Sequence, residues 1–152
     1  MSQIKISRQI PQPPDRIWAA LADLESHSRW MKDAEQVVIT SEESRGVGTT
    51  MEVETRVGPF RTNDVMEVVG WEEHSYIEVV HKGLIEGHGR LEVGSEGDGR
   101  DGTVTWSETL WFPWWLGGRV VAFVASPVLR SIWRGNLKRL EELIATSGPD
   151  GD

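Results

Sequence analysis

Glu108, Asp64 and His81 are the residues of this chain whose types suit chemistry on a small molecule. Residues 103–112 alternate between apolar side chains and threonine or serine, which predicts a strand with Glu108 on the same face as Trp106. A carboxyl group among apolar side chains can act as a general acid or base, and a nearby aspartate and histidine can exchange protons with it. We therefore take Glu108, with Asp64 and His81, as the candidate catalytic residues.

The position of Asp64 depends on the register of one hairpin. A two-residue turn at Gly58 and Pro59 would pair Val57 with Phe60, and this register places Asp64 on the apolar face. A turn one residue longer would move Asp64 to the opposite face, because a slip of one residue inverts every side chain of a strand.

Each candidate also has a structural interpretation without catalysis. An inward Glu108 could pair with an arginine, Asp64 could face outward, and His81 could be solvated near the end of its strand. The spacing of His81, Glu86 and His88 matches no known metal site, so the sequence predicts neither a metal nor a cofactor.

Composition narrows the class of protein. The 152 residues suit a single domain, which we place at residues 1–146 with a tail at residues 147–152. The absence of cysteine excludes disulfides and thiolate catalysis. The net charge of -8 argues against a nucleic-acid partner. No stretch reaches the roughly 18 apolar residues of a membrane span, so we expect a cytoplasmic protein without stable membrane insertion.

Alternation and helical spacing predict an ordered set of elements. A first strand and two short helical segments precede several further strands, and one long helix ends the domain. The expected strands cover residues 4–10, 37–39, 51–57, 60–66, 76–82, 84–93 and 103–112, and the expected helices cover residues 15–22, 29–31 and 119–146. Pro127 is expected to kink or break the long helix, because proline removes a backbone donor.

The long helix carries two apolar stripes on different faces. The first stripe contains Leu116, Val120, Phe123, Val124 and Pro127. The second contains Leu129, Trp133, Leu137, Leu140 and Ile144 and is rotated well away from the first. Two tryptophans, Trp114 and Trp115, precede the helix, and we expect them to form a gate or lid over a cavity rather than a membrane contact.

Four sequence segments resemble the START-like (SRPBCC) superfamily, specifically its bacterial polyketide cyclase/dehydrase-like branch. They are Ile-Pro-x-Pro-Pro-Asp-Arg-Ile-Trp-x-x-Leu-x-Asp at residues 10–23 followed by Trp30, Gly-Val-Gly-Thr at 46–49, Gly-Thr-Val-Thr-Trp at 102–106, and Leu-x-x-Leu-Glu at 137–141. Many relatives have proline after the tryptophan matched by Trp30, whereas this chain has Met31. The resemblance implies an α+β helix-grip fold, in which about seven antiparallel strands curve around the C-terminal helix.

The fold implied by this resemblance leaves room for a hydrophobic ligand between sheet and helix. The expected ligand-binding residues are Trp30, Met51, Val53, Met66, Trp106, Leu110, Phe112, Phe123 and Trp133. Our first hypothesis is a carrier of a lipid or polyketide-like molecule, and our second is a cyclase or dehydratase that uses Glu108. A third is a stress-response or toxin-like interaction module, which only the tryptophan pair supports. Oligomeric state stays open, a homodimer included.

Overall fold

The computed structural model describes residues 2–96 and 100–146 of the chain. Its elements in chain order are β1 (Ser2–Ile10), α1 (Pro14–Ala22), η1 (Leu24–Arg29), β2 (Ala34–Ile39), β3 (Thr50–Val57), β4 (Phe60–Glu72), β5 (Tyr76–Lys82), β6 (Glu86–Glu96), β7 (Asp101–Trp111), η2 (Trp114–Leu116) and α2 (Gly118–Thr146). The predicted tail at residues 147–152 and the middle of the connection between β6 and β7 lie outside the described residues.

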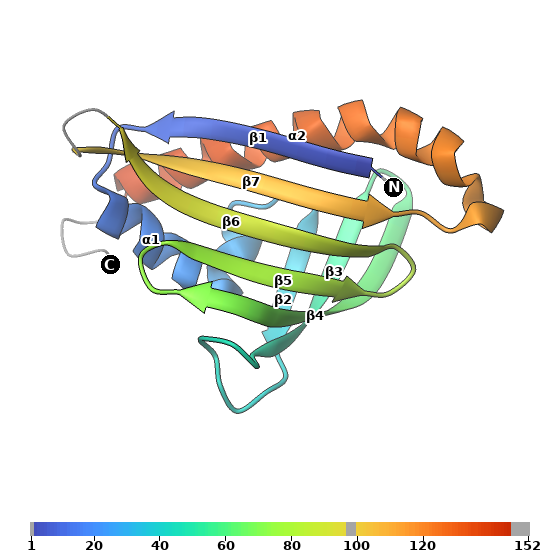
Figure 1. The fold of residues 1–152 in the computed structure, drawn as a ribbon, viewed down its shortest axis with the longest axis horizontal. Coiled ribbons are helices and arrows are strands. Elements are labelled where there is room, and N and C mark those ends of the chain that lie inside the picture. The colour runs from blue at the N-terminus through green and yellow to red at the C-terminus, as the bar shows by residue number, and fades with distance from the viewer. Residues whose placement is uncertain (1, 97–99, 147–152) are drawn as a thin grey trace.

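Within the described residues, seven antiparallel strands form one curved sheet in the order β1-β7-β6-β5-β4-β3-β2 (Figure 1). The long helix α2 runs along one side of this sheet, and α1 lies at one end of it. The predicted helix-grip architecture is therefore confirmed. The core forms where the inner face of the sheet meets α2, and it includes Ile4, Ile6, Val68, Val104, Leu137 and Leu140.

The hairpin of β3 and β4 has the register that the short turn predicts. Val57 pairs with Phe60, and Val53 pairs with Asp64. Gly58 begins the turn with a φ of 59°, a conformation that glycine adopts without a side-chain clash. Asp64 therefore faces the inner side of the sheet.

The helical segments after β1 begin as expected, but the second lies earlier than predicted. Pro14 occupies the first turn of α1, where its missing N–H is not needed. The second segment is the 3-10 helix η1, which ends at Arg29, so Trp30 follows it and residues 29–31 do not form a helical turn. Trp30 donates its backbone N–H to the carbonyl of His27, and this bond caps the segment.

Helix α2 continues through Pro127, which was expected from the sequence to kink or break it. The bond that proline removes would reach the carbonyl of Phe123, on a side of the helix where side chains are exposed to water. Water can replace the missing donor there, so the helix need not end. No helix of the described residues has the length and apolar character needed to cross a bilayer.

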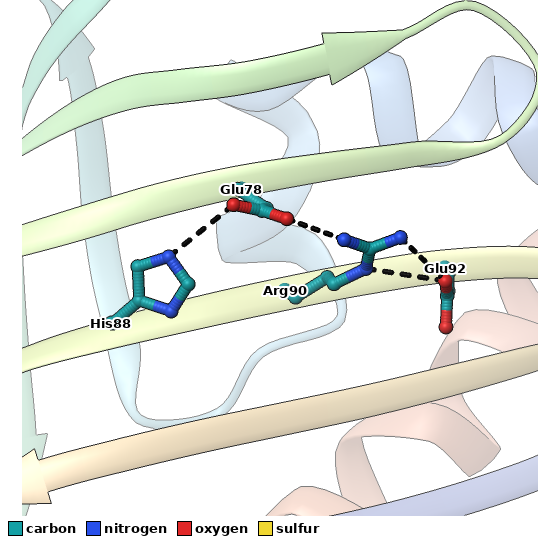
Figure 2. Close-up of polar contacts among 4 residues, drawn as sticks. All are labelled: Glu78, His88, Arg90 and Glu92. Carbon is teal, nitrogen blue, oxygen red and sulfur yellow. Dashed lines mark hydrogen bonds and ion pairs between the residues drawn. The ribbon is translucent and has the colours of Figure 1, made fainter.

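Strand alternation separates the polar groups of β5 and β6 between the two faces of the sheet. On the outer face, His88 lies 3.3 Å from Glu78, and Arg90 bridges Glu78 and Glu92 (Figure 2). His81 lies on the inner face, so it cannot share a metal ion with His88. Within the described residues, no cluster of three metal-ligating side chains is present.

Candidate functional site

A cavity of about 190 Å³ lies on the inner side of the sheet, between β3–β7 and α2. Most of its wall is apolar. Of the predicted ligand-binding residues, Met51, Val53, Met66, Trp106, Leu110, Phe112 and Trp133 line it, as do the candidate catalytic residues Asp64, His81 and Glu108. The structure therefore brings the three ionisable groups into one cavity.

Two predicted wall residues lie elsewhere. Phe123 is 83% exposed and belongs to the first apolar stripe of α2, which faces away from the sheet. Trp30 is fully buried behind the cavity, where it packs edge-to-face on Trp106 with the ring centroids 6.1 Å apart. Neither residue lines the cavity. Helical spacing alone cannot say which of two stripes faces the core, and burial alone cannot distinguish a wall from the layer behind it.

Glu108 and His81 come from strands that are not neighbours. Glu108 is on β7, His81 is on β5, and β6 lies between them. Oε1 of Glu108 nevertheless lies 3.4 Å from Nε2 of His81. The contact is geometrically possible because the inward positions of β6 beside these residues are Gly87 and Gly89, which carry no side chain.

Gly89 is the closer of the two glycines to this pair. A Cβ at position 89 would lie 2.8 Å from Oε1 of Glu108 and 3.3 Å from Nε2 of His81. Any other residue would therefore displace the carboxylate. From the sequence these glycines were interpreted only as weak points of a strand, although glycine inside a strand also marks a close approach of other groups.

The charges around His81 favour its protonated form. Burial by itself lowers the pKa of His81, but the nearby charge of Glu108 and the charge of Asp64 outweigh burial and raise this pKa above 6.5. Nε2 of His81 has no aligned hydrogen-bond partner among the described residues, so its contact with Glu108 acts mainly through charge. Nε2 is itself buried and faces the carboxylate of Glu108.

Hydrogen bonds orient the two carboxylates. Trp106 donates its indole N–H to Oε1 of Glu108 over 3.2 Å, and both side chains are buried. Thr62 donates its hydroxyl to Oδ2 of Asp64 over 2.9 Å. The two residues of each pair are two positions apart on one strand and therefore share a face of the sheet. This spacing allows the first bond to form within β7 and the second within β4.

Stacked tryptophans form the part of the cavity wall beside Glu108. The rings of Trp106 and Trp133 lie 4.8 Å apart with an angle of 17° between their planes. Trp133 donates its indole N–H to Asp33 over 3.1 Å, and Asp33 also accepts a 2.7 Å hydrogen bond from the side chain of Asn136. The position of the aromatic wall is therefore held by a polar network that includes an acidic cavity residue.

Asp33 and Asn136 were not predicted from the sequence. Asn136 is fully buried, and its side-chain oxygen accepts the backbone N–H of Lys32 over 2.9 Å. One signal was present, because an asparagine on the buried side of an amphipathic helix needs polar partners. Its partners are distant in the chain, so the sequence could not identify them.

His27 is a second buried histidine in the wall, with a different role. Its Nε2 lies 2.8 Å from the carbonyl oxygen of Leu21, and burial lowers the pKa of His27 below 6.5. A neutral ring that donates to this carbonyl links η1 to the end of α1. Of the two cavity histidines, only His81 is placed to carry a charge.

The arrangement can bind a mainly apolar molecule and offer polar groups to one part of it. It contains His81, whose protonation the neighbouring Glu108 and Asp64 favour by raising its pKa. Small-molecule sites commonly combine apolar walls with a few polar groups of this kind.

Comparison with solved structures shows the same fold in other proteins. The chain resembles the protein TTHA0849 from Thermus thermophilus with a TM-score of 0.79 and 20% identity, over 95% of this chain and 99% of that one. It resembles a START superfamily protein from Mycobacterium smegmatis with a TM-score of 0.73 and 13% identity, over 94% and 99% of the two chains. Ara h 8.0201 matches with a TM-score of 0.67 and 12% identity, over 95% and 98%. At such identities these similarities show the fold alone.

Sequence comparison shows the family. No curated protein sequence matches the chain. The family profile described as "Polyketide cyclase / dehydrase and lipid transport" matches residues 1–145. This match covers every element from β1 to nearly the end of α2. The chain therefore belongs to the polyketide cyclase/dehydrase and lipid transport family of START-like proteins.

Proposed function

We propose that this protein binds and carries a hydrophobic small molecule in the cavity between its sheet and α2. The observation that carries the proposal is the cavity of about 190 Å³ with a mostly apolar wall. A volume of about 150 Å³ is enough for benzene in an engineered apolar cavity, so this one is large enough for at least an aromatic ring. The family includes proteins of lipid transport, which is consistent with a carrier.

The polar groups favour one kind of ligand. Glu108 and Asp64 provide two carboxylates beside the single imidazole of His81, so an anionic group of a ligand would be repelled. A hydroxyl or phenol can donate a hydrogen bond to the carboxylate of Glu108 or of Asp64, which both line the cavity. We therefore expect hydroxylated aromatic or sterol-like ligands to bind more tightly than fatty acids of similar apolar area.

Tryptophan fluorescence titration tests the proposal, because Trp106 and Trp133 form one wall. Fatty acids, sterols and aromatic polyketide-like compounds would each be titrated into the protein. We expect saturable binding, strongest for a hydroxylated compound. A panel without any response, together with native mass spectra free of bound ligand, would contradict the carrier function.

A matched pair of variants localises the binding. Val79 lines the cavity, whereas Val80 is the next residue on β5 and faces the other side of the sheet. Val79→Phe should fill the cavity and weaken binding by about tenfold or more, while Val80→Phe should change it by less than about twofold. Equal effects of the two variants would place the ligand elsewhere. Melting temperatures show whether both variants remain folded.

An enzymatic function is the second candidate, and the contact between His81 and Glu108 supports it. Protonated His81 could donate its proton to a carbonyl oxygen while the carboxylate of Glu108 accepts a proton from the adjacent carbon, which forms an enol. Cyclisation or dehydration of a polyketide-like substrate could proceed from such a species.

Substitution of the carboxylate separates the two candidates. Glu108→Gln keeps the size of the side chain but removes the proton acceptor. An enzyme should lose turnover with nearly unchanged ligand affinity, and Glu78→Gln on the outer face of the sheet should retain turnover. If Glu108→Gln turns over substrate as fast as the unchanged protein, this residue is not the acid–base group.

A further inference from the structure

An apolar patch covers the start of α2 and the turn before it. Trp114 is 87% exposed, Phe123 83% and Val120 70%, and large parts of Trp115, Leu116 and Val124 are also exposed. We call these six residues the apolar patch. Exposed apolar side chains that gather in one place usually mark a contact surface, whereas scattered ones need no explanation.

The patch forms because the first apolar stripe of α2 faces water, whereas the apolar face of an amphipathic helix usually packs on the core. Val120, Phe123 and Val124 follow helical spacing and form one stripe, yet this stripe faces water. The first turns of α2, coloured orange in Figure 1, lie at the edge of the molecule beyond the end of β7. The sheet does not extend far enough to cover them.

The same outward face becomes cationic further along the helix. Arg130 and Arg134 follow Phe123 and Pro127 by seven residues each, which places them in line with the apolar stripe. Arg119 lies beside Val120 at the start of the stripe. These three arginines form no ion pair within the described residues.

The charge of this region differs from that of the rest of the chain. Residues 109–140 contain five basic residues and no acidic one, although the whole chain carries a net charge of -8. The expectation of a lid rather than a membrane contact relied on the overall acidic balance. The local charge, however, determines what a surface attracts.

The patch is continuous in the chain with the cavity wall. The chain enters the patch after Phe112 and leaves it before Leu129, and both of these residues line the cavity. A surface docked on the patch would therefore contact a segment whose two ends border the cavity.

We propose that the apolar patch and the adjacent arginines dock on the surface of an anionic lipid bilayer. Tryptophan and phenylalanine enter the boundary between headgroups and acyl chains, and Arg119, Arg130 and Arg134 contact lipid phosphates. The contact is peripheral, because the helix enters only by one face. This inference goes beyond ligand carriage and does not depend on it, since the docking residues lie outside the cavity.

Charge favours a bilayer over a second copy of the chain as the occupant. In a two-fold dimer residue i of one copy contacts residue j of the other, and residues 109–140 offer no acidic side chain to pair with the arginines of a second copy. An anionic bilayer can contact both parts of this face, because its acyl chains bury the apolar patch and its phosphates pair with the arginines.

Vesicle flotation tests the proposal with the unmodified protein. The probes are vesicles of phosphatidylcholine alone and vesicles of phosphatidylcholine with phosphatidylglycerol. We expect flotation with the anionic vesicles, loss of it at high salt, and little flotation with phosphatidylcholine alone. Equal flotation with both vesicle types, or none with either, would overturn the proposal.

Two variants and two controls assign the binding to this face. Trp114→Ser with Phe123→Ser removes apolar contact, and Arg130→Gln with Arg134→Gln removes charge. Each pair should weaken binding by about tenfold or more. Phe60→Ser, at a side chain that is 73% exposed in another turn, should bind as the unmodified protein does. Arg61→Gln, which removes an exposed charge at the same turn, should also leave binding unchanged.

Light scattering measures the oligomeric state and so tests whether a second copy of the chain covers the apolar patch instead. A dimer that the serine variants convert to a monomer, in a protein that does not float with anionic vesicles, would identify the patch as a self-association surface and overturn the proposal. All substitutions are at surface residues, so unchanged melting temperatures confirm that a lost interaction is not lost folding.

Discussion

Nε2 of His81 lies 3.4 Å from Oε1 of Glu108, although the strands that carry them are separated by β6. Neighbouring strands are about 4.8 Å apart, so two such steps separate β5 from β7. The side chains meet only because Gly87 and Gly89 leave the inner surface of β6 bare. The cavity thus has a polar region at Glu108 and His81, and the chemistry of this region depends on the contact between them.

The first prediction concerns the proton on His81. Glu108→Gln removes the charge that most strongly favours protonation, so the pKa of His81 should fall, because burial then dominates. NMR titration of the imidazole signals measures this change directly. Glu78→Gln, which affects only the outer-face contacts with His88 and Arg90, should leave the His81 titration unchanged. A His81 titration that is the same in both variants would contradict the assigned contact.

The second prediction is a pH dependence of stability. Folded His81 has a pKa above 6.5, so as pH rises past 6.5 the unfolded chain releases this proton while the folded chain still holds it. The folded state then binds more protons, and the free energy of unfolding falls until the pH passes the raised pKa. Urea denaturation at several pH values should show this fall, and His81→Gln should reduce it.

The pKa of His27 is shifted in the opposite direction to that of His81, so His27 should affect the pH dependence of stability in the opposite way. Because its pKa is lowered in the folded state, the unfolded chain takes up a proton first as the pH falls below 6.5. The free energy of unfolding therefore falls on the acid side, and His27→Gln should reduce that loss. If His81→Gln instead altered the acid side, the raised pKa of His81 would be wrong.

The third prediction tests the glycine gap. Gly89→Ala places a methyl group 2.8 Å from Oε1 of Glu108, so the carboxylate must move and weaken its bond with Trp106. We expect a loss of about 1–3 kcal/mol in the free energy of unfolding. Gly94→Ala, on the same strand, has no atom within 4 Å of its new Cβ and should be neutral or slightly stabilising. Similar losses in both variants would indicate that replacing any glycine of β6 destabilises the strand, and that a clash with Glu108 is not the cause.

The fourth prediction concerns the network behind the aromatic wall. Asn136→Ala removes the amide donor from Oδ1 of Asp33 and leaves the backbone N–H of Lys32 without its side-chain acceptor. The expected loss is about 2–4 kcal/mol, measured by urea denaturation, with a changed fluorescence of Trp133. Asn63→Ala, at an exposed position of β4, should change stability by less than about 0.5 kcal/mol. A neutral Asn136→Ala would mean that the network does not stabilise the fold.

Much of the site could be predicted from the sequence because strands have a strict period of two. Alternation alone placed Glu108 beside Trp106, and a short turn at Gly58 placed Asp64 on the inner face. The order of elements and the motifs in residues 10–23 were enough for the fold class. Strand faces, turns and the order of elements depend on residues that are close together in the chain, so the sequence is enough to predict them.

Contacts between distant residues were decided by the tertiary structure. The sequence alone identified Glu108, Asp64 and His81 as residues on apolar faces, but only the strand order and the bare surface of β6 bring Glu108 to His81. Likewise, periodicity identified two stripes on α2, but the extent of the sheet determines that Phe123 faces water and Trp133 faces the cavity. Alternation and helical spacing describe one element at a time, whereas burial depends on which other elements pack against it.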